Sequence, residues 1–283
     1  MADNAQQFRS LPIGVFDSGV GGLTVLRALR SQMLNEQFLY LGDTARLPYG
    51  SKSPETIQRY SLQAASFLMS RGIKCLVVAC NTASATALPL LQQHFQSIPV
   101  IGVVEPGAAA GCEKSATGRI AVIATESTVQ GGAYQRAIQR IRADIKVVAR
   151  ACPLFVALAE EGWTSGSIVE DIAHRYLDGL FNVADAPDTL LLGCTHFPVL
   201  RGALRNVVGD QVQLVDSADT TAVALRALLE AQQLTTHATE AGSVKFMATD
   251  GCDRFARVAA HFLDQSLTSN DVELVEPTFS ARA

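Results

Sequence analysis

Short apolar runs alternate with longer amphipathic stretches along most of this chain. The first four runs are rich in branched or aromatic side chains, and this composition predicts buried strands. They occupy residues 13–16, 38–42, 75–79 and 99–103. Helical spacing of apolar residues fills the stretches between them. Strands that alternate with helices in this way predict parallel sheets joined by right-handed crossovers.

The helix expected after the second strand has the clearest start and stop signals. Ser53 is a favourable N-cap, Pro54 suits the first turn, and Glu55 faces the positive end of the helix dipole. Gly72 is expected to end this helix.

The pattern then restarts, with expected strands at 120–124, 145–149 and 189–192. These strands follow their counterparts in the first half at nearly constant offsets, which indicates an internal duplication. The sequence therefore predicts an α/β protein with two similar parallel-sheet halves related by pseudo-twofold symmetry, and an active site in the cleft between them.

After residue 216 the chain is expected to return to the first half. This last part contains two expected helices and two expected strands, at residues 218–231, 254–263, 244–248 and 272–275. We therefore expect a first domain made of residues 8–103 and 217–283, and a second domain made of residues 104–216. The two crossings between them would form a hinge, which suits a cleft that closes.

Two cysteines occupy equivalent positions in the two expected halves. Cys80 and Cys194 each follow an apolar strand and a small residue, and each precedes polar residues and an expected helix. Ligands of open α/β sheets bind beyond the carboxyl ends of the strands, so both thiols are expected at one cleft. A helix N-terminus or a nearby cation lowers the pKa of a thiol, so we expect one thiolate base and one thiol acid.

Inverting a carbon centre without a cofactor requires a base on one face of the carbon and an acid on the other. Asp17 and His196 are placed to influence the thiols of their own halves through charge or hydrogen bonding. Two other classes remain open at this point. A hydrolase would use Cys194 and His196 without Cys80, and an amino-acid binding protein would need neither thiol.

A glycine-rich segment, residues 14–24, lies at the first strand-to-helix turn. Its spacing partly resembles a dinucleotide-binding fingerprint, but Thr24 stands at the third glycine position and Asp17 would repel a pyrophosphate. Binding a small zwitterion fits this segment better. The polar loop at 42–50 is expected either to cover the ligand or to be an ordinary surface loop with an Asp43–Arg46 pair.

Composition and charge narrow the possible classes of protein further. Hydrophobic residues make up 48% of the 283 residues and charged residues 18%, which is typical of a globular protein and excludes a disordered one. The net charge is −4 and no basic stripe is present, so a nucleic-acid ligand is not expected. No signal peptide and no membrane-spanning run is recognisable, so we expect a cytoplasmic protein with free thiols.

Several segments together resemble the motif series of glutamate racemases, in the aspartate/glutamate racemase superfamily. These segments are 14–24, 42–50, 79–85, 151–156 and 193–198, and they occur in the family's order over nearly the whole chain. The resemblance implies interconversion of L- and D-glutamate by two bases without pyridoxal phosphate or another cofactor. The product D-glutamate would supply peptidoglycan synthesis, and with it cell-wall biogenesis and cell shape. An aspartate racemase, or another superfamily member with the same two-thiol site, is the alternative.

The resemblance also assigns roles to residues. It implies that Cys80 and Cys194 exchange protons with the substrate, assisted by Asp17 and His196. It further implies a glutamate after the Phe155-Val156 run, for which the register favours Glu160 over the adjacent Glu161. The implied substrate-binding residues are Asp17, Ser18, Tyr49, Gly50, Asn81, Thr82, Thr195 and His196. No metal is implied, and a homodimer is compatible with the family.

Overall fold

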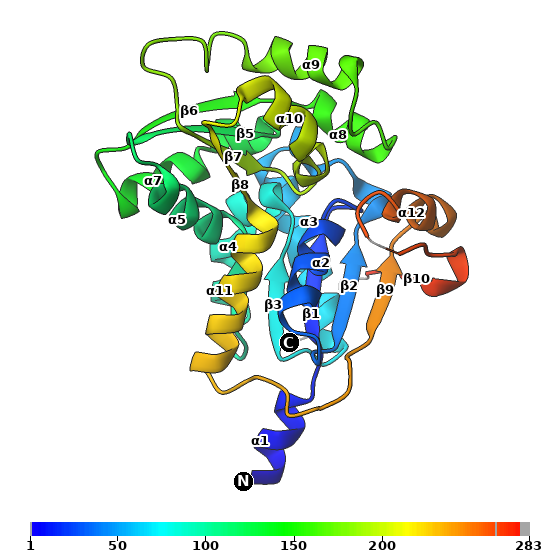
Figure 1. Cartoon of the computed structure of the whole chain (residues 1–283). Coiled ribbons are helices and arrows are strands. Elements are labelled where there is room, and N and C mark those ends of the chain that lie inside the picture. The colour runs from blue at the N-terminus through cyan, green and yellow to red at the C-terminus, as the bar shows by residue number, and fades with distance from the viewer. Residues whose placement is uncertain (1, 264, 278–283) are drawn as a thin grey trace.

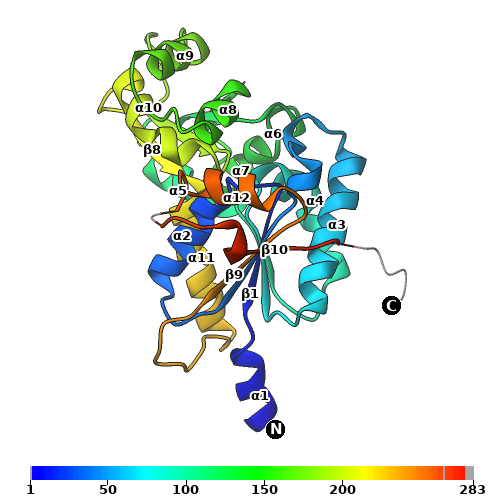
Figure 2. The same cartoon turned by 90° about the vertical axis from the view of Figure 1, so that its right-hand side faces the viewer.

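The computed structural model describes residues 2–263 and 265–277, and these residues form two open sheets flanked by helices (Figure 1). The first sheet has six strands in the order β10-β9-β2-β1-β3-β4, and the second has four in the order β6-β5-β7-β8. Every described strand pair is parallel. Figure 2 shows the same two layered halves from the side, with α1 projecting from the larger half.

The strands have the following bounds: β1 Ile13–Asp17, β2 Phe38–Gly42, β3 Cys75–Val78, β4 Val100–Gly102, β5 Arg119–Ala124, β6 Lys146–Ala151, β7 Thr189–Gly193, β8 Gln213–Asp216, β9 Val244–Ala248 and β10 Val272–Leu274. The α-helices have the following bounds: α1 Ala2–Arg9, α2 Leu23–Gln32, α3 Pro54–Ser70, α4 Asn81–His94, α5 Val104–Lys114, α6 Glu126–Gly131, α7 Ala133–Ile141, α8 Leu154–Glu160, α9 Ser167–Leu177, α10 Arg201–Val208, α11 Ser217–Ala231 and α12 Cys252–Ala259. Short 3₁₀ turns also occur, among them η3 at Phe197–Leu200.

The two sheets repeat one strand order. In the first sheet β2-β1-β3-β4 are neighbours in this sequence, and in the second sheet β6-β5-β7-β8 are neighbours in the corresponding sequence. The first half differs by the addition of β9 and β10 beside β2. This arrangement confirms the predicted α/β fold with two similar parallel-sheet halves. The domain boundaries at residues 104 and 217 stay a prediction, and residues 264 and 278–283 of the predicted first domain lie outside the described residues.

Both faces of each sheet are covered by helices, which explains the continuous apolar character of the strands. Residues of β1 alternate between the two sides: Val15 packs into one buried cluster and Phe16 into another. The second sheet repeats this arrangement, with Ile123 of β5 on one side and Val122 on the other. The core of each half therefore consists of two apolar layers separated by a sheet.

The apolar patterns and capping residues of the sequence predicted the ends of most helices and strands to within one or two residues. The Ser53 hydroxyl accepts a hydrogen bond from the Thr56 backbone amide at the start of α3, and Gly72 follows the helix with a φ of 73°. Two expectations were wrong. The last helix ends at Ala259 rather than residue 263. The prediction was too long because the buried side chains of Phe262 and Leu263 continue the apolar pattern beyond the end of the helix.

The chain after the second cysteine also differs from the prediction. Cys80 directly precedes the α-helix α4, as expected. Cys194 is instead followed by the 3₁₀ turn η3, which contains Pro198, and the α-helix α10 begins only at Arg201. The two thiols therefore do not share the same helix N-terminus environment.

The return from the second half to the first begins at the end of β8. The Asp216 carboxylate caps α11 by accepting hydrogen bonds from the backbone amides of Ala218 and Asp219, both at 3.1 Å. Its other oxygen accepts a hydrogen bond from Arg201 at 3.0 Å. This carboxylate thus fixes the start of a helix that packs against both α2 and α5. No helix in the described part of the chain is long and apolar enough to cross a membrane.

A buried ion pair joins distant segments at the end of the first sheet that is remote from the cleft. The Lys74 ammonium donates to the Glu36 carboxylate at 2.5 Å and to the Arg9 carbonyl at 2.6 Å. The second Glu36 oxygen accepts a hydrogen bond from the Thr236 backbone amide at 2.8 Å. Because both side chains are almost completely buried, neither charge has water to replace its partner.

We expect the substitution Glu36→Leu to destabilise the protein by about 3 kcal/mol, because it leaves the Lys74 ammonium buried without its counter-charge. The double substitution Glu36→Leu with Lys74→Met should recover most of this loss. Urea unfolding followed by circular dichroism measures both effects. Equal unfolding midpoints for the wild type and the single variant would show that Glu36 does not stabilise the buried Lys74 ammonium.

Candidate active site

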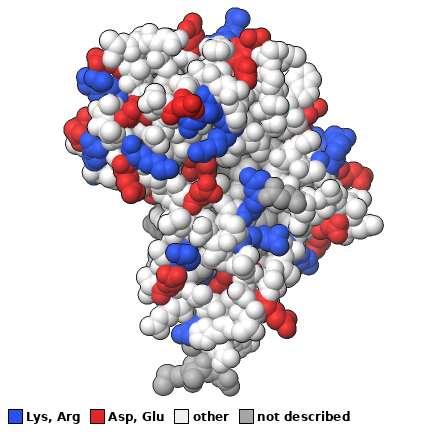
Figure 3. All heavy atoms as spheres, in the orientation of Figure 1, with Lys and Arg blue, Asp and Glu red and all other residues white. Residues whose placement is uncertain are grey.

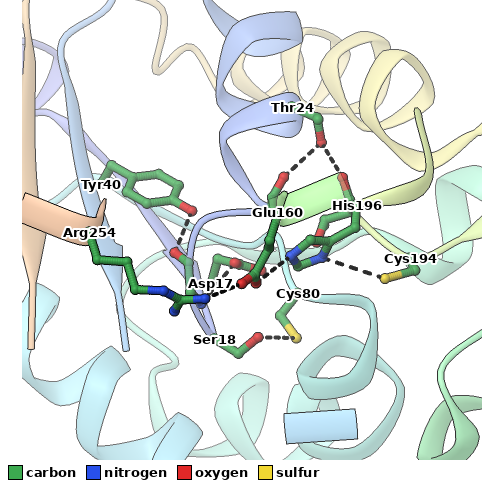
Figure 4. Close-up of polar contacts among 12 residues, drawn as sticks. Asp17, Ser18, Thr24, Tyr40, Cys80, Glu160, Cys194, His196 and Arg254 are labelled. Atoms are coloured by element: carbon green, nitrogen blue, oxygen red, sulfur yellow. Dashed lines mark hydrogen bonds and ion pairs between the residues drawn. The ribbon is translucent and has the colours of Figure 1, made fainter. Parts of the chain in front are cut away.

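A cavity of about 330 Å³ lies between the two halves, at the carboxyl ends of their strands. This volume suits a small molecule. The cavity is lined by ten of the residues singled out from the sequence: Ser18, Tyr49, Gly50, Cys80, Asn81, Thr82, Glu160, Cys194, Thr195 and His196. Both cysteines thus open onto one space from equivalent strands, β3 and β7. Figure 4 shows the central polar groups.

Cys80 lies in an environment that favours the neutral thiol. Its sulfur accepts a hydrogen bond from the Ala83 backbone amide and lies 3.4 Å from the Ser18 hydroxyl. Burial, reinforced by the nearby Asp17 carboxylate, nevertheless raises the pKa of the Cys80 thiol to about 12. The expectation that a helix N-terminus lowers this pKa was therefore wrong, because burial outweighs the helix amides.

Asp17 ends β1 and is fully buried. One carboxylate oxygen accepts a hydrogen bond from the Gly19 backbone amide at 2.9 Å, whereas its Oδ1 has no hydrogen-bond partner in the described structure. Burial raises the pKa of this carboxyl, although the charge of His196 opposes the shift. Asp17 does not line the cavity, so in this structure it influences the site through Cys80 and His196. Its predicted contact with substrate stays a prediction.

The second thiol has a different set of neighbours. The sulfur of Cys194 lies 3.8 Å from Nδ1 of His196, and Nε2 of the same ring lies 3.1 Å from a carboxylate oxygen of Glu160 (Figure 4). Burial lowers the pKa of His196, but its contacts with Cys194 and Glu160 outweigh burial and raise it to about 10. The imidazole is then a cation at neutral pH, and it lies beside the Cys194 sulfur.

The structure distinguishes the two adjacent glutamates. Burial disfavours ionisation of Glu160, but His196 and Arg254 together hold the pKa of this carboxyl below its ordinary value. Arg254 donates to the second Glu160 oxygen at 2.7 Å. Glu161 is exposed and does not line the cavity. Glu160 is therefore the member of the pair that faces the site.

The loop after β2 forms one wall of the cavity. The Tyr49 hydroxyl donates to the buried Asp43 carboxylate at 2.5 Å, and Thr249 donates to the other Asp43 oxygen at 3.0 Å. Arg46 lies 3.6 Å from the same carboxylate, so the pair expected from the sequence is present. These contacts anchor the loop, and Tyr49 and Gly50 line the cavity as a result.

Two small polar clusters connect the halves on either side of Cys80. The hydroxyl of Thr82 lies 2.9 Å from that of Thr125 and 3.2 Å from that of Thr128, across the cleft. The Asn81 amide donates to the hydroxyl of Tyr134, a residue of α7, at 2.7 Å. The positions next to Cys80 are therefore fixed partly by side chains of the other half.

The glycine-rich segment serves close packing between the halves. A Cβ atom at Gly21 would collide with the His196 ring and the Thr195 hydroxyl. Nearby, the Thr24 hydroxyl donates to the Thr195 carbonyl at 2.9 Å. The segment thus lets β1 and the loop after β7 approach each other, which the sequence had suggested only as a ligand-binding turn.

Sequence reasoning missed several residues at the site. Thr125 and Glu126 line the cavity, and the rule applied to the cysteines could have found them, since they follow the expected strand at 120–124. Tyr134 and Arg254 have no local signal, because each reaches the site only through packing between the halves. No group of three or more His, Cys, Asp or Glu side chains in the described ranges is arranged to hold a metal ion.

The distribution of charged side chains on the surface agrees with the lack of a basic stripe in the sequence. On the face shown in Figure 3, basic and acidic side chains are interspersed rather than gathered into a single-sign stripe. Several exposed charges form ion pairs, such as Arg119 with Asp185 and Arg140 with Glu105.

Known proteins resemble this chain in both sequence and fold. The family model for Asp/Glu/Hydantoin racemases matches residues 21–225. A glutamate racemase from Geobacter metallireducens is 50% identical over 255 residues, which cover 90% of this chain and 93% of the relative.

Solved structures agree with this match. A glutamate racemase isoform from Bacillus anthracis superposes with a TM-score of 0.89 at 35% identity, and the glutamate racemase of Francisella tularensis in complex with D-glutamate superposes with 0.87 at 36%. Each covers 95% of this chain, and 98% of its own chain is covered. The chain therefore belongs to the Asp/Glu/Hydantoin racemase family and, within it, to the glutamate racemases.

Proposed function

We propose that this amino-acid racemase interconverts L- and D-glutamate without a cofactor, with Cys80 and Cys194 as the two acid/base groups. One observation carries the proposal: the two thiols stand at the ends of equivalent strands and open onto the same small cavity from opposite halves. The substrate itself is suggested by the glutamate racemases that this chain resembles, one of which was crystallised with D-glutamate.

Proton transfer proceeds in two steps. A thiolate on one side removes the α-hydrogen of glutamate, and its sulfur becomes a thiol while the electron pair stays on the α-carbon. The thiol on the other side then donates its proton to the opposite face of that carbon, which inverts the configuration. The two sulfurs have exchanged protonation states, and proton exchange with water restores the starting form.

The environments of the two thiols differ. His196, whose pKa is raised to about 10, lies beside Cys194, whereas burial and Asp17 favour a neutral Cys80 thiol. In the proposed mechanism each enantiomer requires the thiolate on the side that its α-hydrogen faces, and the opposite sulfur carries the proton.

Polar groups around the cavity are suited to the charged groups of the substrate. Ser18, Asn81, Thr82 and Thr195 offer hydroxyl and amide groups near the thiols, and the Tyr49–Gly50 wall lies beside them. We assign these residues to substrate binding, together with His196. We further propose that D-glutamate made in the cytoplasm feeds peptidoglycan synthesis, which the family resemblance supports. A homodimer is compatible with this role, and no nucleic acid is required.

We expect Cys80→Ala and Cys194→Ala each to lower glutamate racemisation by three orders of magnitude or more, since each removes one of two required proton carriers. Circular dichroism of L-glutamate mixed with the purified protein, without added cofactor, measures the reaction. The control is Cys252→Ala, which changes a half-buried thiol outside the cavity and should keep full activity.

The same assays also distinguish the proposed racemase from the alternative functions. Full activity of Cys80→Ala would replace the two-thiol mechanism with a single-cysteine reaction at Cys194. A wild type that leaves glutamate unchanged but racemises aspartate would identify an aspartate racemase. Binding of glutamate without exchange of its α-hydrogen for solvent deuterium would identify a binding protein.

We expect His196 to stay protonated through pH 8 and to lose its proton near pH 10, because Glu160 and Cys194 stabilise the cation. Glu160→Gln removes one of these stabilising groups, so His196 should then lose its proton at lower pH. Histidine NMR of labelled protein follows both titrations. Identical titration curves for the two proteins would show that Glu160 does not control the imidazole.

A further inference from the structure

Four side chains form one continuous chain of contacts from the protein surface to the second thiol. Arg254 donates to Oε2 of Glu160 at 2.7 Å, and Oε1 of Glu160 lies 3.1 Å from Nε2 of His196. Nδ1 of His196 then lies 3.8 Å from the Cys194 sulfur. Figure 4 shows the four residues in this order.

The first link of this chain crosses between the two halves. Arg254 lies on α12, which follows β9 of the six-stranded sheet, whereas Glu160 lies on α8, which follows β6 of the four-stranded sheet. Figures 1 and 2 both show α12 and α8 near each other where the halves meet. A second contact supports this approach, because a Cβ atom at Gly162, just after α8, would strike the His261 ring, just after α12.

Arg254 stands at the outer end of the chain and does not reach the cavity. Its side chain is 50% exposed, compared with 13% for Glu160 and 8% for His196. It lines a separate, smaller hollow beside Thr44 and Asp250, and it is not among the residues lining the site cavity. In the described structure, the contact that connects Arg254 to the site is its ion pair with Glu160.

We propose that Arg254 is a positioning residue for the Cys194 half of the site. Its guanidinium holds Glu160 against His196 across the junction of the two halves. The imidazole ring is thereby fixed beside Cys194. This inference rests on the proposed racemase function.

Charge pairing explains why the arginine matters. A guanidinium fixes the orientation of a carboxylate better than a mobile partner does, because its donors are rigid and planar. Glu160 is largely buried, so losing Arg254 leaves one of its oxygens without a partner on the side that faces away from His196. The Glu160 carboxylate is then held less firmly in the orientation in which it contacts His196.

The charged and titratable groups around this chain are few. Cys194 and Glu160 contact His196 directly, and Asp17 acts on it through its charge. Arg254 faces Glu160, with Asp250 in the adjoining hollow, and Asp253, Arg257 and His261 lie on or just after the same helix.

The two directions of the reaction offer a specific test. Because L- and D-glutamate have equal free energies, kcat/KM must be the same from either side in any variant. Deuterium on the α-carbon removes this constraint, since it slows only the step that breaks the labelled bond. A defect confined to Cys194 should therefore raise the primary isotope effect for the enantiomer deprotonated by Cys194 and lower it for the other.

The experiment compares Arg254→Gln and Arg254→Lys with the control Arg257→Gln, all in the full chain. Arg257 is an exposed residue of the same helix and makes no hydrogen bond or ion pair in the described structure. We expect Arg254→Gln to lower kcat/KM by up to about fivefold with opposite changes in the two isotope effects, a size consistent with one half-exposed ion pair. Arg254→Lys should recover only part of the loss, because its flexible ammonium keeps the charge but holds the carboxylate less rigidly, and the control should match the wild type.

A double-mutant cycle with Glu160→Gln tests the route of the effect. If Arg254 acts through Glu160, adding Arg254→Gln to that background should change kcat/KM less than twofold. A further loss as large as that of Arg254→Gln alone would overturn the proposal. A rise in KM alone with unchanged isotope effects would also overturn it, because that result is expected from attraction of the anionic substrate.

Histidine NMR keeps the test independent of activity. The Nε2 proton of His196, which faces Glu160, should exchange with water faster in Arg254→Gln than in the Arg257→Gln control, because Glu160 is held less firmly against the ring. If the wild type does not racemise glutamate, the proposed function fails, and this exchange rate alone decides the inference. Equal exchange rates in the two variants would overturn it.

Discussion

The Glu160–His196 contact is the interaction on which the site depends, because it stabilises a positive charge inside the junction of two apolar halves. A buried imidazolium is costly unless a counter-charge lies beside it. Glu160 supplies that charge from α8, and Arg254 completes the pairing of the carboxylate from the other half. The electrostatics of the site therefore require both halves to be in place.

The fold gives the two thiols equivalent positions, but the chain gives them different surroundings. Each cysteine follows the third strand of its half, so duplication alone would predict two similar acid/base groups. Cys80 lies near a buried carboxylate and is held as a thiol, with its pKa raised to about 12, whereas Cys194 lies beside a cation. Equivalent positions in the two sheets therefore do not give the two thiols equivalent electrostatic surroundings.

Contacts between the halves lie close to the cavity. Thr82 contacts Thr125 and Asn81 contacts Tyr134 next to the first thiol, and Thr24 contacts Thr195 next to the second. Gly21 allows this closeness, since any side chain there would displace His196. The surroundings of both thiols therefore depend on how the two halves pack against each other.

The sequence by itself determined the strands, most helix starts, the duplication and the placement of the thiols at strand ends. These follow from periodicity and capping, which act over a few residues, and from the rule that parallel strands end at one edge. Only the tertiary structure decided which distant groups meet there. Arg254 and Glu160 are 94 residues apart, and no local pattern links them. The structure also reversed the expected pKa shift of Cys80, because burial depends on how both halves pack and outweighs the local helix amides.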